Sequence, residues 1–240
     1  MNGLDLIIEY PNAFPDNLCD EMIERFEDDD TKAPGHSGNY GPNFSKGKVS
    51  TDLFITGLPE WEDIDTKIYD ILSPYIRRYV SLLSNNFFVE EILHISDQGY
   101  QIQRTDPGGF FNWHCDHTAY PILDQIILTG DNDPSVCVRD RIATYIIYLN
   151  DRTQLTEGTT EFKFGDNFKT IVPERGKLIM FPANILYPHR GVPLETGVKY
   201  IMTGWVTRDI VCRLQKSPQD YTQRFERYGE LPHYTPMDNR

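Results

Sequence analysis

Hydrophobic and polar positions follow two different periods along the chain, and the change between them falls near residue 86. Before that point, apolar residues recur every three or four positions, the spacing that places them on one face of a helix. We expect one helix to begin with Asp16 as its N-cap and to end in the acidic run at 27–30, and a second to span about 62–84. Pro74 lies inside the second helix and predicts a kink or a break there.

Beyond residue 86 the pattern changes to short β-type runs bounded by Gly, Pro, Asp or Asn. Strands that follow two helices predict a mainly β protein, with a double-stranded β-helix (jelly-roll) core and the helices packed on one sheet. The stretches 33–48 and 119–140 are expected to be long loops. The predicted strands are Glu91–Thr105, Phe110–His117, Ile142–Leu149, Thr160–Phe164, Lys169–Val172, Lys177–Phe181, Leu186–His189 and Val198–Val206.

The expected organisation is one domain over residues 1–208, made of a helical part (1–86) and the jelly-roll core (87–208). A charged, tyrosine-rich tail follows at 209–240, with a helix expected near 219–227. No apolar run approaches the roughly 20 residues that span a bilayer, and the N-terminus lacks the basic segment of a signal peptide. The sequence therefore predicts a soluble, cytoplasmic protein.

The charge balance narrows the class of partner. The chain has 36 acidic and 23 basic residues, a formal net charge of −13. Such a field repels phosphate backbones and anionic lipid, which argues against nucleic acid and membrane surfaces as partners. The four cysteines show no zinc-ribbon spacing, and free thiols in a reducing compartment are the simplest interpretation.

Two histidines and an aspartate form the candidate site. His114 and Asp116 are two positions apart in a predicted strand, so their side chains point to the same face. A chain with 6 histidines and 36 acidic residues is expected to contain such a pair by chance. His189, 75 residues downstream, completes two imidazoles and one carboxylate. That set leaves metal positions open, either for oxygen chemistry at iron(II) or for hydrolysis at zinc.

Lys199 favours oxygen chemistry. It lies ten residues beyond His189 in an apolar predicted strand, where a buried ammonium group needs a partner. The partner could be a structural carboxylate, or it could be the distal carboxylate of 2-oxoglutarate, whose 2-oxo acid end would chelate iron. A hydrolytic zinc site needs no such lysine.

With these residues in place, the sequence resembles the prolyl 4-hydroxylase branch of the iron(II)/2-oxoglutarate-dependent dioxygenase family, over roughly residues 11–207. The family's three metal ligands are matched by His114, Asp116 and His189, and its cosubstrate lysine by Lys199. Weaker matches follow in the family's order. They are Arg141–Leu149, Glu157–Thr160, Pro173–Phe181 and Trp205.

The resemblance implies iron(II), 2-oxoglutarate and O₂ as cofactors, with ascorbate as a further expected requirement, and formation of succinate and CO₂. Thr160 matches a position that contacts the cosubstrate. Thr105 stands where the family has a tyrosine that touches the cosubstrate carboxylate. Gln103, Tyr100 or Tyr145 could supply that contact instead, or the contact could be lost.

The resemblance also implies a substrate, a proline-containing protein or peptide hydroxylated at carbon 4 of proline. Arg141, Trp205 and Phe111 match positions of the substrate site, although Phe111 replaces a family tyrosine. The enzyme could instead hydroxylate another residue or a small molecule. From other classes, a zinc hydrolase and a non-catalytic binding module on the same scaffold remain open, and the sequence does not set the oligomeric state.

Overall fold

The computed structural model describes residues 3–35, 47–87, 95–117, 122–128, 134–152, 154 and 156–213, except for the side chains of 118–139 and 209–213. The chain divides into two compact units. One comprises Met1–Tyr120 and Asp140–Asp209, and the other comprises Pro121–Arg139 and Ile210–Arg240. The expected division into a domain over 1–208 and a tail stays a prediction.

Helix α1 spans Asp16–Asp28 and, as its spacing predicts, buries one face, which carries Leu18, Met22 and Phe26. The predicted cap is wrong by one residue. Asp16 is the first helical residue, and Pro15 occupies the N-cap position with φ −69° and ψ 143°. Proline fits there because its fixed φ is compatible with the extended cap conformation and its missing N–H is not needed.

Helix α2 spans Glu62–Phe87 and continues through Pro74 without a break. Proline removes one helical hydrogen bond and crowds the preceding turn. Here Pro74 is exposed, while Leu72 and Ile76 on either side of it are buried. Packing of that buried face holds the helix together across the proline. Two short 3-10 turns, η1 (Gly3–Leu6) and η3 (Pro59–Trp61), accompany the α-helices.

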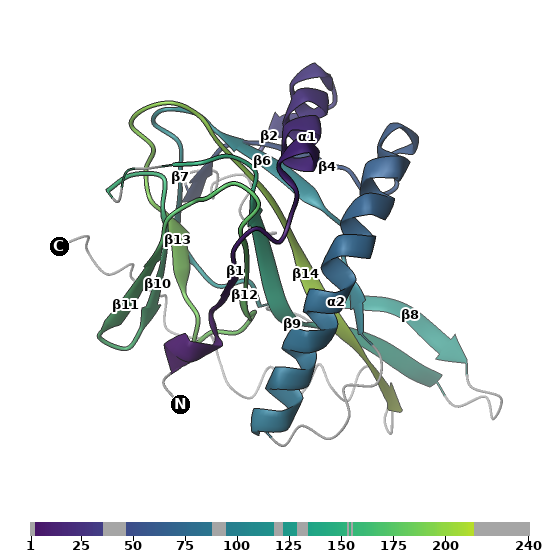
Figure 1. The fold of residues 1–240 in the computed structure, drawn as a ribbon. Helices are drawn as coiled ribbons and strands as arrows, with labels where there is room; N and C mark the ends of the chain where they lie inside the picture. The colour runs from purple at the N-terminus through teal and green to yellow at the C-terminus, as the bar shows by residue number, and fades with distance from the viewer. Residues whose placement is uncertain are drawn as a thin grey trace. The chain divides into compact units, whose positions relative to one another are not determined.

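The strands form two antiparallel sheets, and α1 and α2 lie on one face of the larger sheet (Figure 1). The smaller sheet has the order β11 (Asn167–Ile171), β10 (Thr160–Phe164), β13 (His189–Gly191), β7 (Phe110–His114) and β3 (Lys48–Val49). In the larger sheet the order is β1 (Ile8–Tyr10), β12 (Leu178–Pro182), β9 (Pro134–Tyr148), β14 (Lys199–Arg213), β6 (Gln101–Thr105), β4 (Thr51–Phe54) and β2 (Ala33–Pro34), and β5 (Ile95–Asp97) pairs with β14. This is the helix-covered, mainly β architecture that the sequence predicts.

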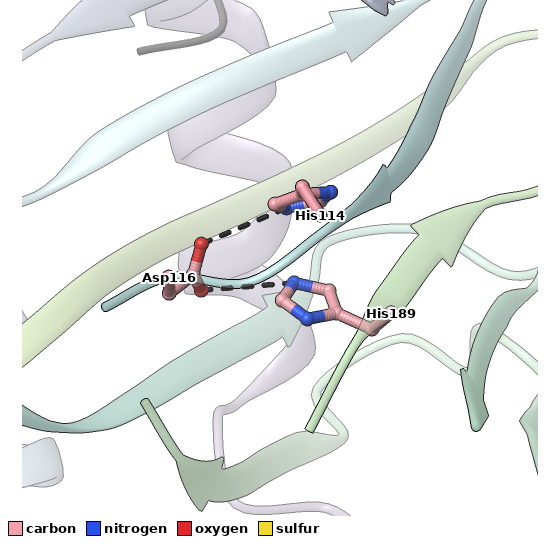
Figure 2. Close-up of side chains that lie close together, drawn as sticks. All are labelled: His114, Asp116 and His189. Carbon is pink, nitrogen blue, oxygen red and sulfur yellow. Dashed lines mark ion pairs between the residues drawn. The ribbon is translucent and has the colours of Figure 1, made fainter. Parts of the chain in front are cut away.

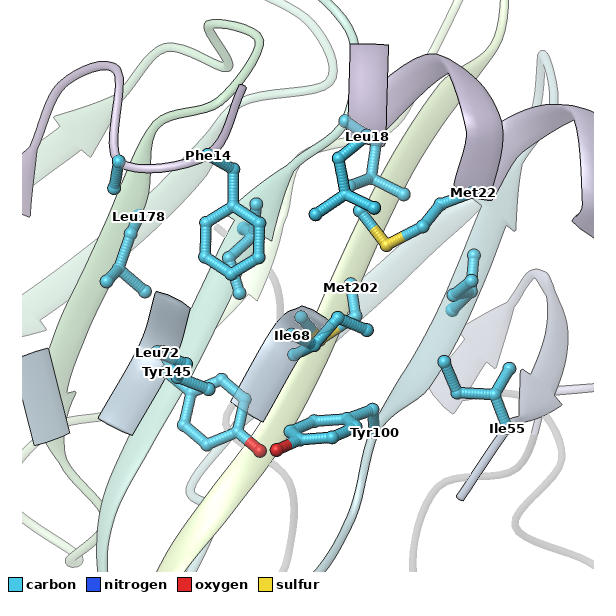
Figure 3. Close-up of a cluster of buried hydrophobic side chains, with 14 of the residues drawn as sticks. Phe14, Leu18, Met22, Ile55, Ile68, Leu72, Tyr100, Tyr145, Leu178 and Met202 are labelled. Carbon is cyan, nitrogen blue, oxygen red and sulfur yellow. The ribbon is translucent and has the colours of Figure 1, made fainter. Parts of the chain in front are cut away.

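Both faces of the larger sheet are buried, because its side chains alternate between two apolar clusters. Tyr145 and Ile147 of β9 belong to the cluster beneath the helices, which Figure 3 shows. Ile146 and Tyr148 of the same strand belong to a second cluster, together with Phe162 of the smaller sheet. The space between the two sheets is therefore the second core of the fold, and the candidate site lies beside it.

The second unit contains a hairpin where a loop was expected. Strand β8 (Ile122–Leu128) pairs antiparallel with the first residues of β9, from Leu128↔Pro134 to Ile122↔Arg139. The prediction of a loop over 119–140 is therefore wrong, because the β-branched runs in these two segments favour strands. The first expected loop, 33–48, has β2 and β3 at its ends and otherwise lies mostly outside the described residues, as does the expected tail helix. None of the described helices combines the length and apolar content that crossing a bilayer requires.

Candidate active site

Strand pairing in the smaller sheet brings His114, Asp116 and His189 together. His114 is the last residue of β7, His189 is the first residue of β13, and the two are register partners. Asp116 follows β7 by two residues. One ligand atom from each of the three side chains lies within 4.8 Å of the others (Figure 2).

The hydrogen bonds of the two imidazoles decide which nitrogen faces the cluster. Nδ1 of His114 lies 2.8 Å from the carbonyl oxygen of Asn112, and Nδ1 of His189 lies 3.2 Å from that of Tyr187. A carbonyl only accepts, so each Nδ1 carries the hydrogen and each Nε2 keeps a lone pair. Both Nε2 atoms are 3.6 Å from the carboxylate oxygens of Asp116. Two imidazole lone pairs and one carboxylate thus converge on one point.

Burial and mutual repulsion keep the site ready for a cation. Burial, followed by the nearby His189, lowers the pKa of His114 to about 3, so its imidazole is neutral at physiological pH. Burial would raise the pKa of Asp116, but the two histidines, the Thr144 hydroxyl and Arg141 together hold it below its ordinary value. The aspartate is therefore ionised, and both ligand types are in the protonation state that metal binding needs.

Two residues orient the Asp116 side chain and backbone. The Thr144 hydroxyl donates to Oδ2 of Asp116 at 2.8 Å, and Arg141 donates to its backbone carbonyl at 3.3 Å. Thr144 was not predicted as a site residue. A polar residue inside the apolar run of β9, two positions from the cavity-lining Ile146, is the sequence signal that could have found it.

A cavity open to solvent leads from this cluster to Lys199. On β14, residues Lys199, Ile201, Thr203 and Trp205 line it, as expected for every second residue of one strand. Thr160 of β10 lines the same cavity, and its Oγ1 accepts a hydrogen bond of 2.8 Å from Tyr148. The Thr160 hydrogen is therefore free to be donated into the cavity.

Lys199 is a buried cation without an anion. It is 6% exposed, and within the described part of the chain its ammonium group makes no hydrogen bond or ion pair. Its Nζ lies over the Tyr148 ring, 5.8 Å from the ring centroid. Burial, and then the positive charge of Arg152, lowers the pKa of Lys199 to about 8. An unpaired ammonium here is costly unless a carboxylate enters the cavity.

A second lysine at the cavity shows the contrast. Lys48 of β3 is 5% exposed, and its Nζ lies 2.6 Å from Oδ2 of Asp52. The other oxygen of that carboxylate, Oδ1, accepts a hydrogen bond of 2.7 Å from the Ser50 hydroxyl. The charge of Lys48 is therefore already balanced by an ion pair with Asp52, whereas the charge of Lys199 has no such partner among the described residues. An anionic ligand is expected at the Lys199 end of the cavity.

These residues fit a divalent metal and a dicarboxylate. Two neutral imidazoles and one carboxylate match the donor set of the iron(II) facial triad. The described residues supply no fourth histidine, cysteine or acid to this cluster, so ligand positions stay open for other molecules. The unpaired charge of Lys199, in the same cavity, fits a second carboxylate on a molecule that reaches the metal.

Comparison with known proteins gives the same family. Residues 100–207 match the model of the 2OG-Fe(II) oxygenase superfamily. This part of the chain, which contains His114, Asp116, His189 and Lys199, is thus similar to the 2OG-Fe(II) oxygenases. No curated protein matches the sequence.

Solved structures of such oxygenases share the fold. The viral collagen prolyl hydroxylase of Paramecium bursaria Chlorella virus-1, solved with 2OG, aligns with a TM-score of 0.56 at 17% identity, over 85% of this chain and 96% of that one. A Trichoplax adhaerens prolyl hydroxylase, in complex with a hypoxia-inducible factor peptide, gives 0.62 at 15%, over 87% and 84%. The epimerase SnoN from nogalamycin biosynthesis gives 0.59 at 12%, over 88% and 80%. These similarities confirm the jelly-roll fold of the oxygenases.

Two of the residues expected to contact the oxygenase cosubstrate do not reach the cavity. Tyr100 and Tyr145 lie in the cluster beneath the helices (Figure 3), and their hydroxyls contact Asp97 and the Gly99 carbonyl. Tyr145 points that way because its neighbours in the strand, Thr144 and Ile146, face the cavity. These two predictions are wrong.

The other residues in question do face the cavity. Thr105 is the register partner of Lys199, and both it and Gln103 line the cavity wall. Gln103 is 8% exposed and donates from Nε2 to Gln101 at 2.8 Å. Of the three candidates to replace the family tyrosine, Gln103 alone has access to the cavity.

The residues expected to contact substrate surround the metal end of the cavity. The Phe111 ring stacks on His114 with centroids 3.5 Å apart, and it lines the cavity together with Trp205. The indole Nε1–H of Trp205 is buried and has no hydrogen-bond partner among the described residues. Arg141 stacks on the Trp205 ring at 3.8 Å and donates to Gln98, so it supports the wall and does not line it.

Proposed function

We propose that this oxygenase domain binds iron(II) and 2-oxoglutarate and hydroxylates a proline residue of a protein or peptide. One observation carries the proposal: the unpaired ammonium of Lys199 lies in the same cavity as the cluster of His114, Asp116 and His189. A dicarboxylate that reaches the metal would satisfy that charge. The choice of proline is supported by the fold shared with prolyl hydroxylases.

In the proposed reaction, His114, His189 and Asp116 would hold the metal, at which O₂ would be the oxidant. One oxygen atom of O₂ would enter the succinate formed, with CO₂, from 2-oxoglutarate, and the other would enter the substrate. The protein fixes the orientation of both imidazoles through the carbonyls of Asn112 and Tyr187, and burial keeps His114 neutral. Thr144 holds the carboxylate of Asp116 in place. The chain itself thus supplies a preorganised set of ligands.

Lys199 and Thr160 would bind the distal carboxylate of the cosubstrate. Lys199 provides the charge and Thr160 the free hydroxyl hydrogen. Burial raises the pKa of Tyr148, so that the Tyr148 hydroxyl keeps its proton and remains the donor to Thr160. Ammonium and hydroxyl donors together make a directional site for one carboxylate.

Phe111 and Trp205 are the proposed contacts of the substrate. Phe111 presents an aromatic face next to His114, which suits an apolar ring such as that of proline. The unsatisfied Nε1–H of Trp205 would donate to a peptide carbonyl. Because an epimerase shares the fold, a small-molecule substrate is the alternative, and the second experiment below separates the two.

The first experiment tests the metal ligands and the reaction class. His114→Ala removes one of three ligands, so formation of succinate from 2-oxoglutarate with iron and ascorbate should fall below detection. His117→Ala is the matched control, because His117 lies one residue beyond Asp116 and is exposed. Unchanged succinate formation in His114→Ala would refute the assignment. Hydrolytic activity with zinc, and none with iron and 2-oxoglutarate, would support the zinc enzyme instead.

The second experiment tests the substrate. Proline-containing peptides should stimulate 2-oxoglutarate turnover and gain one oxygen atom on proline, as measured by mass spectrometry. The same peptides with alanine in place of proline are the control. Stimulation by small molecules and by none of the peptides would reject the peptidyl-proline proposal while leaving the oxygenase assignment intact.

A further inference from the structure

A buried carboxylate lies behind the Lys199 end of the cavity and takes no part in the proposed chemistry. Glu157 precedes β10 and is 2% exposed. It accepts hydrogen bonds from the backbone amides of Glu195 (2.6 Å) and Thr196 (3.0 Å) and from the Thr196 hydroxyl (2.7 Å). Arg152 donates to it as well, at 3.0 Å. A carboxylate accepts about four hydrogen bonds, so the capacity of Glu157 is fully used.

Arg152 also binds the segment of Glu195 and Thr196 that Glu157 contacts. Its Nη2 donates to the Thr196 carbonyl at 2.5 Å, and its backbone N–H donates to Pro173 at 2.9 Å. The guanidinium group fills the space beside Gly197, where a Cβ atom would collide with Nη1. Gly197 also has φ +67°, a conformation that favours glycine. We call Glu157, Arg152 and Thr196 the carboxylate clamp.

The clamp joins the two segments that carry the proposed cosubstrate residues. Thr160 follows Glu157 by three positions, and Lys199 follows Thr196 by three. A backbone hydrogen bond of 3.2 Å from the Gly158 N–H to the Pro193 carbonyl links the same two segments. Gly158, the residue after Glu157, lies close to both Arg152 and the Lys199 stem, since a Cβ there would be 3.9 Å from Lys199 Cδ and from Arg152 Nε.

We propose that Glu157 is a positioning residue, which holds Lys199 and Thr160 in place through the clamp. It thereby sets how far their carboxylate site lies from the metal ligands, and so fixes the length of dicarboxylate that the cavity accepts. This inference rests on the proposed function. Arg152 is paired with Glu157 at 3.0 Å, whereas Lys199 has no described partner, so the charge of Lys199 is available to the ligand.

The test compares ligands of different length on the manganese(II)-loaded protein. Glu157→Gln keeps the shape but cannot accept at all four positions, so the turn before Lys199 should loosen. We expect the Kd of 2-oxoglutarate, measured by calorimetry, to rise about tenfold. Its preference over 2-oxoadipate, which is one methylene longer, should fall by about the same factor. Manganese affinity should stay within about twofold of the wild type, because the metal ligands are untouched.

A purely electrostatic role predicts the opposite result. Removing a negative charge near Lys199 would strengthen binding of an anion, so tighter binding of 2-oxoglutarate with unchanged length preference would overturn the inference. Glu174→Gln is the matched control, because that carboxylate pairs with Lys177 at 2.7 Å and does not line the cavity. It should bind both ligands as the wild type does.

A milder variant keeps the test decisive if Glu157→Gln fails to fold. Thr196→Val removes one neutral donor to Glu157, and the length preference should fall about threefold. An unchanged preference in that variant would overturn the inference. Failure of the proposed function gives a distinct result, since the wild-type protein with manganese would then not bind 2-oxoglutarate at all.

Discussion

At the scale of single residues, two buried lysines line the same cavity but differ in their effect on the free energy of unfolding. Lys48 is paired with Asp52 at 2.6 Å, while Lys199 has no described partner. The folded-state pKa of Lys199, about 8, lies below the ordinary lysine value of 10.5. The resulting cost to folding is fully present below pH 8 and disappears as pH rises towards 10.5. It amounts to about 3 kcal/mol at neutral pH.

Lys199→Met should therefore stabilise the ligand-free protein while weakening cosubstrate binding. We expect the free energy of unfolding to rise by about 2 kcal/mol, and 2-oxoglutarate affinity to fall at least about 30-fold. Urea unfolding and calorimetry measure the two effects. Lys48→Met is the control and should destabilise by about 3 kcal/mol, because it leaves Asp52 buried without its partner. Equal destabilisation by both variants would contradict the unpaired state of Lys199.

The same group predicts how cosubstrate binding depends on pH. Lys199 must carry its proton to bind a carboxylate, so the Kd of 2-oxoglutarate should be flat below pH 8. Above pH 8 it should rise by up to about tenfold per pH unit. Titration calorimetry of the manganese(II)-loaded protein measures the profile. Lys199→Met provides the baseline for effects of pH on the metal, and a matching rise in that variant would assign the dependence elsewhere.

The residues that could be predicted are those whose chemistry requires a set. His114, Asp116 and His189 come together at the smaller sheet, and Lys199 reaches the same cavity from the larger sheet. Thr144 acts through a single hydrogen bond and belongs to no such set of residues, so its only mark in the sequence is a polar residue inside an apolar strand. Tyr100 and Tyr145 were misplaced because resemblance alone cannot say which face of a strand a side chain occupies, although alternation with Thr144 contains that information.

At the scale of elements, helical and strand periods predicted the order of helices and strands along most of the described chain, and errors arose at their ends. The cap of α1 is shifted by one residue because Pro15 takes the extended position before the helix. The hairpin of β8 and β9 was missed because polar residues within it weakened the apolar pattern. In this hairpin, hydrogen bonds between the two strands stabilise the extended conformation, and the pattern of apolar residues along the sequence does not show such pairing.

Pro74 gives an element-scale prediction. Since α2 runs through it, the proline costs a helical hydrogen bond at an exposed position with no contact that requires its ring. Pro74→Ala should raise the free energy of unfolding by about 1–2 kcal/mol, less than the full helical cost because proline also restricts the unfolded chain. Denaturant unfolding measures it, with Pro15→Ala as the control, for which no gain is expected. A loss of stability in Pro74→Ala would show that packing of α2 needs the proline.

At the scale of the whole molecule, metal binding should be visible as folding stability. The three ligand atoms come from two segments of the chain, one with His114 and Asp116 and the other with His189, and converge only in the folded state. Manganese(II) at 100 times its Kd should add about 2.7 kcal/mol to the free energy of unfolding and raise Tm by a few degrees. Differential scanning calorimetry with and without the metal measures the shift. Asp116→Ala should lose it, and a shift that persists there would place the metal elsewhere.

The pairing of His114 with His189 makes the metal a cross-link between two neighbouring strands. β7 and β13 are 75 residues apart in sequence at this point, so the ion would close a long loop of chain in the way that a disulfide does. Opening of the smaller sheet along this seam would have to break coordination bonds as well as backbone hydrogen bonds. The ion proposed for oxidation would thus also be a reversible cross-link between β7 and β13. Loss of the metal would loosen the smaller sheet first between these two strands.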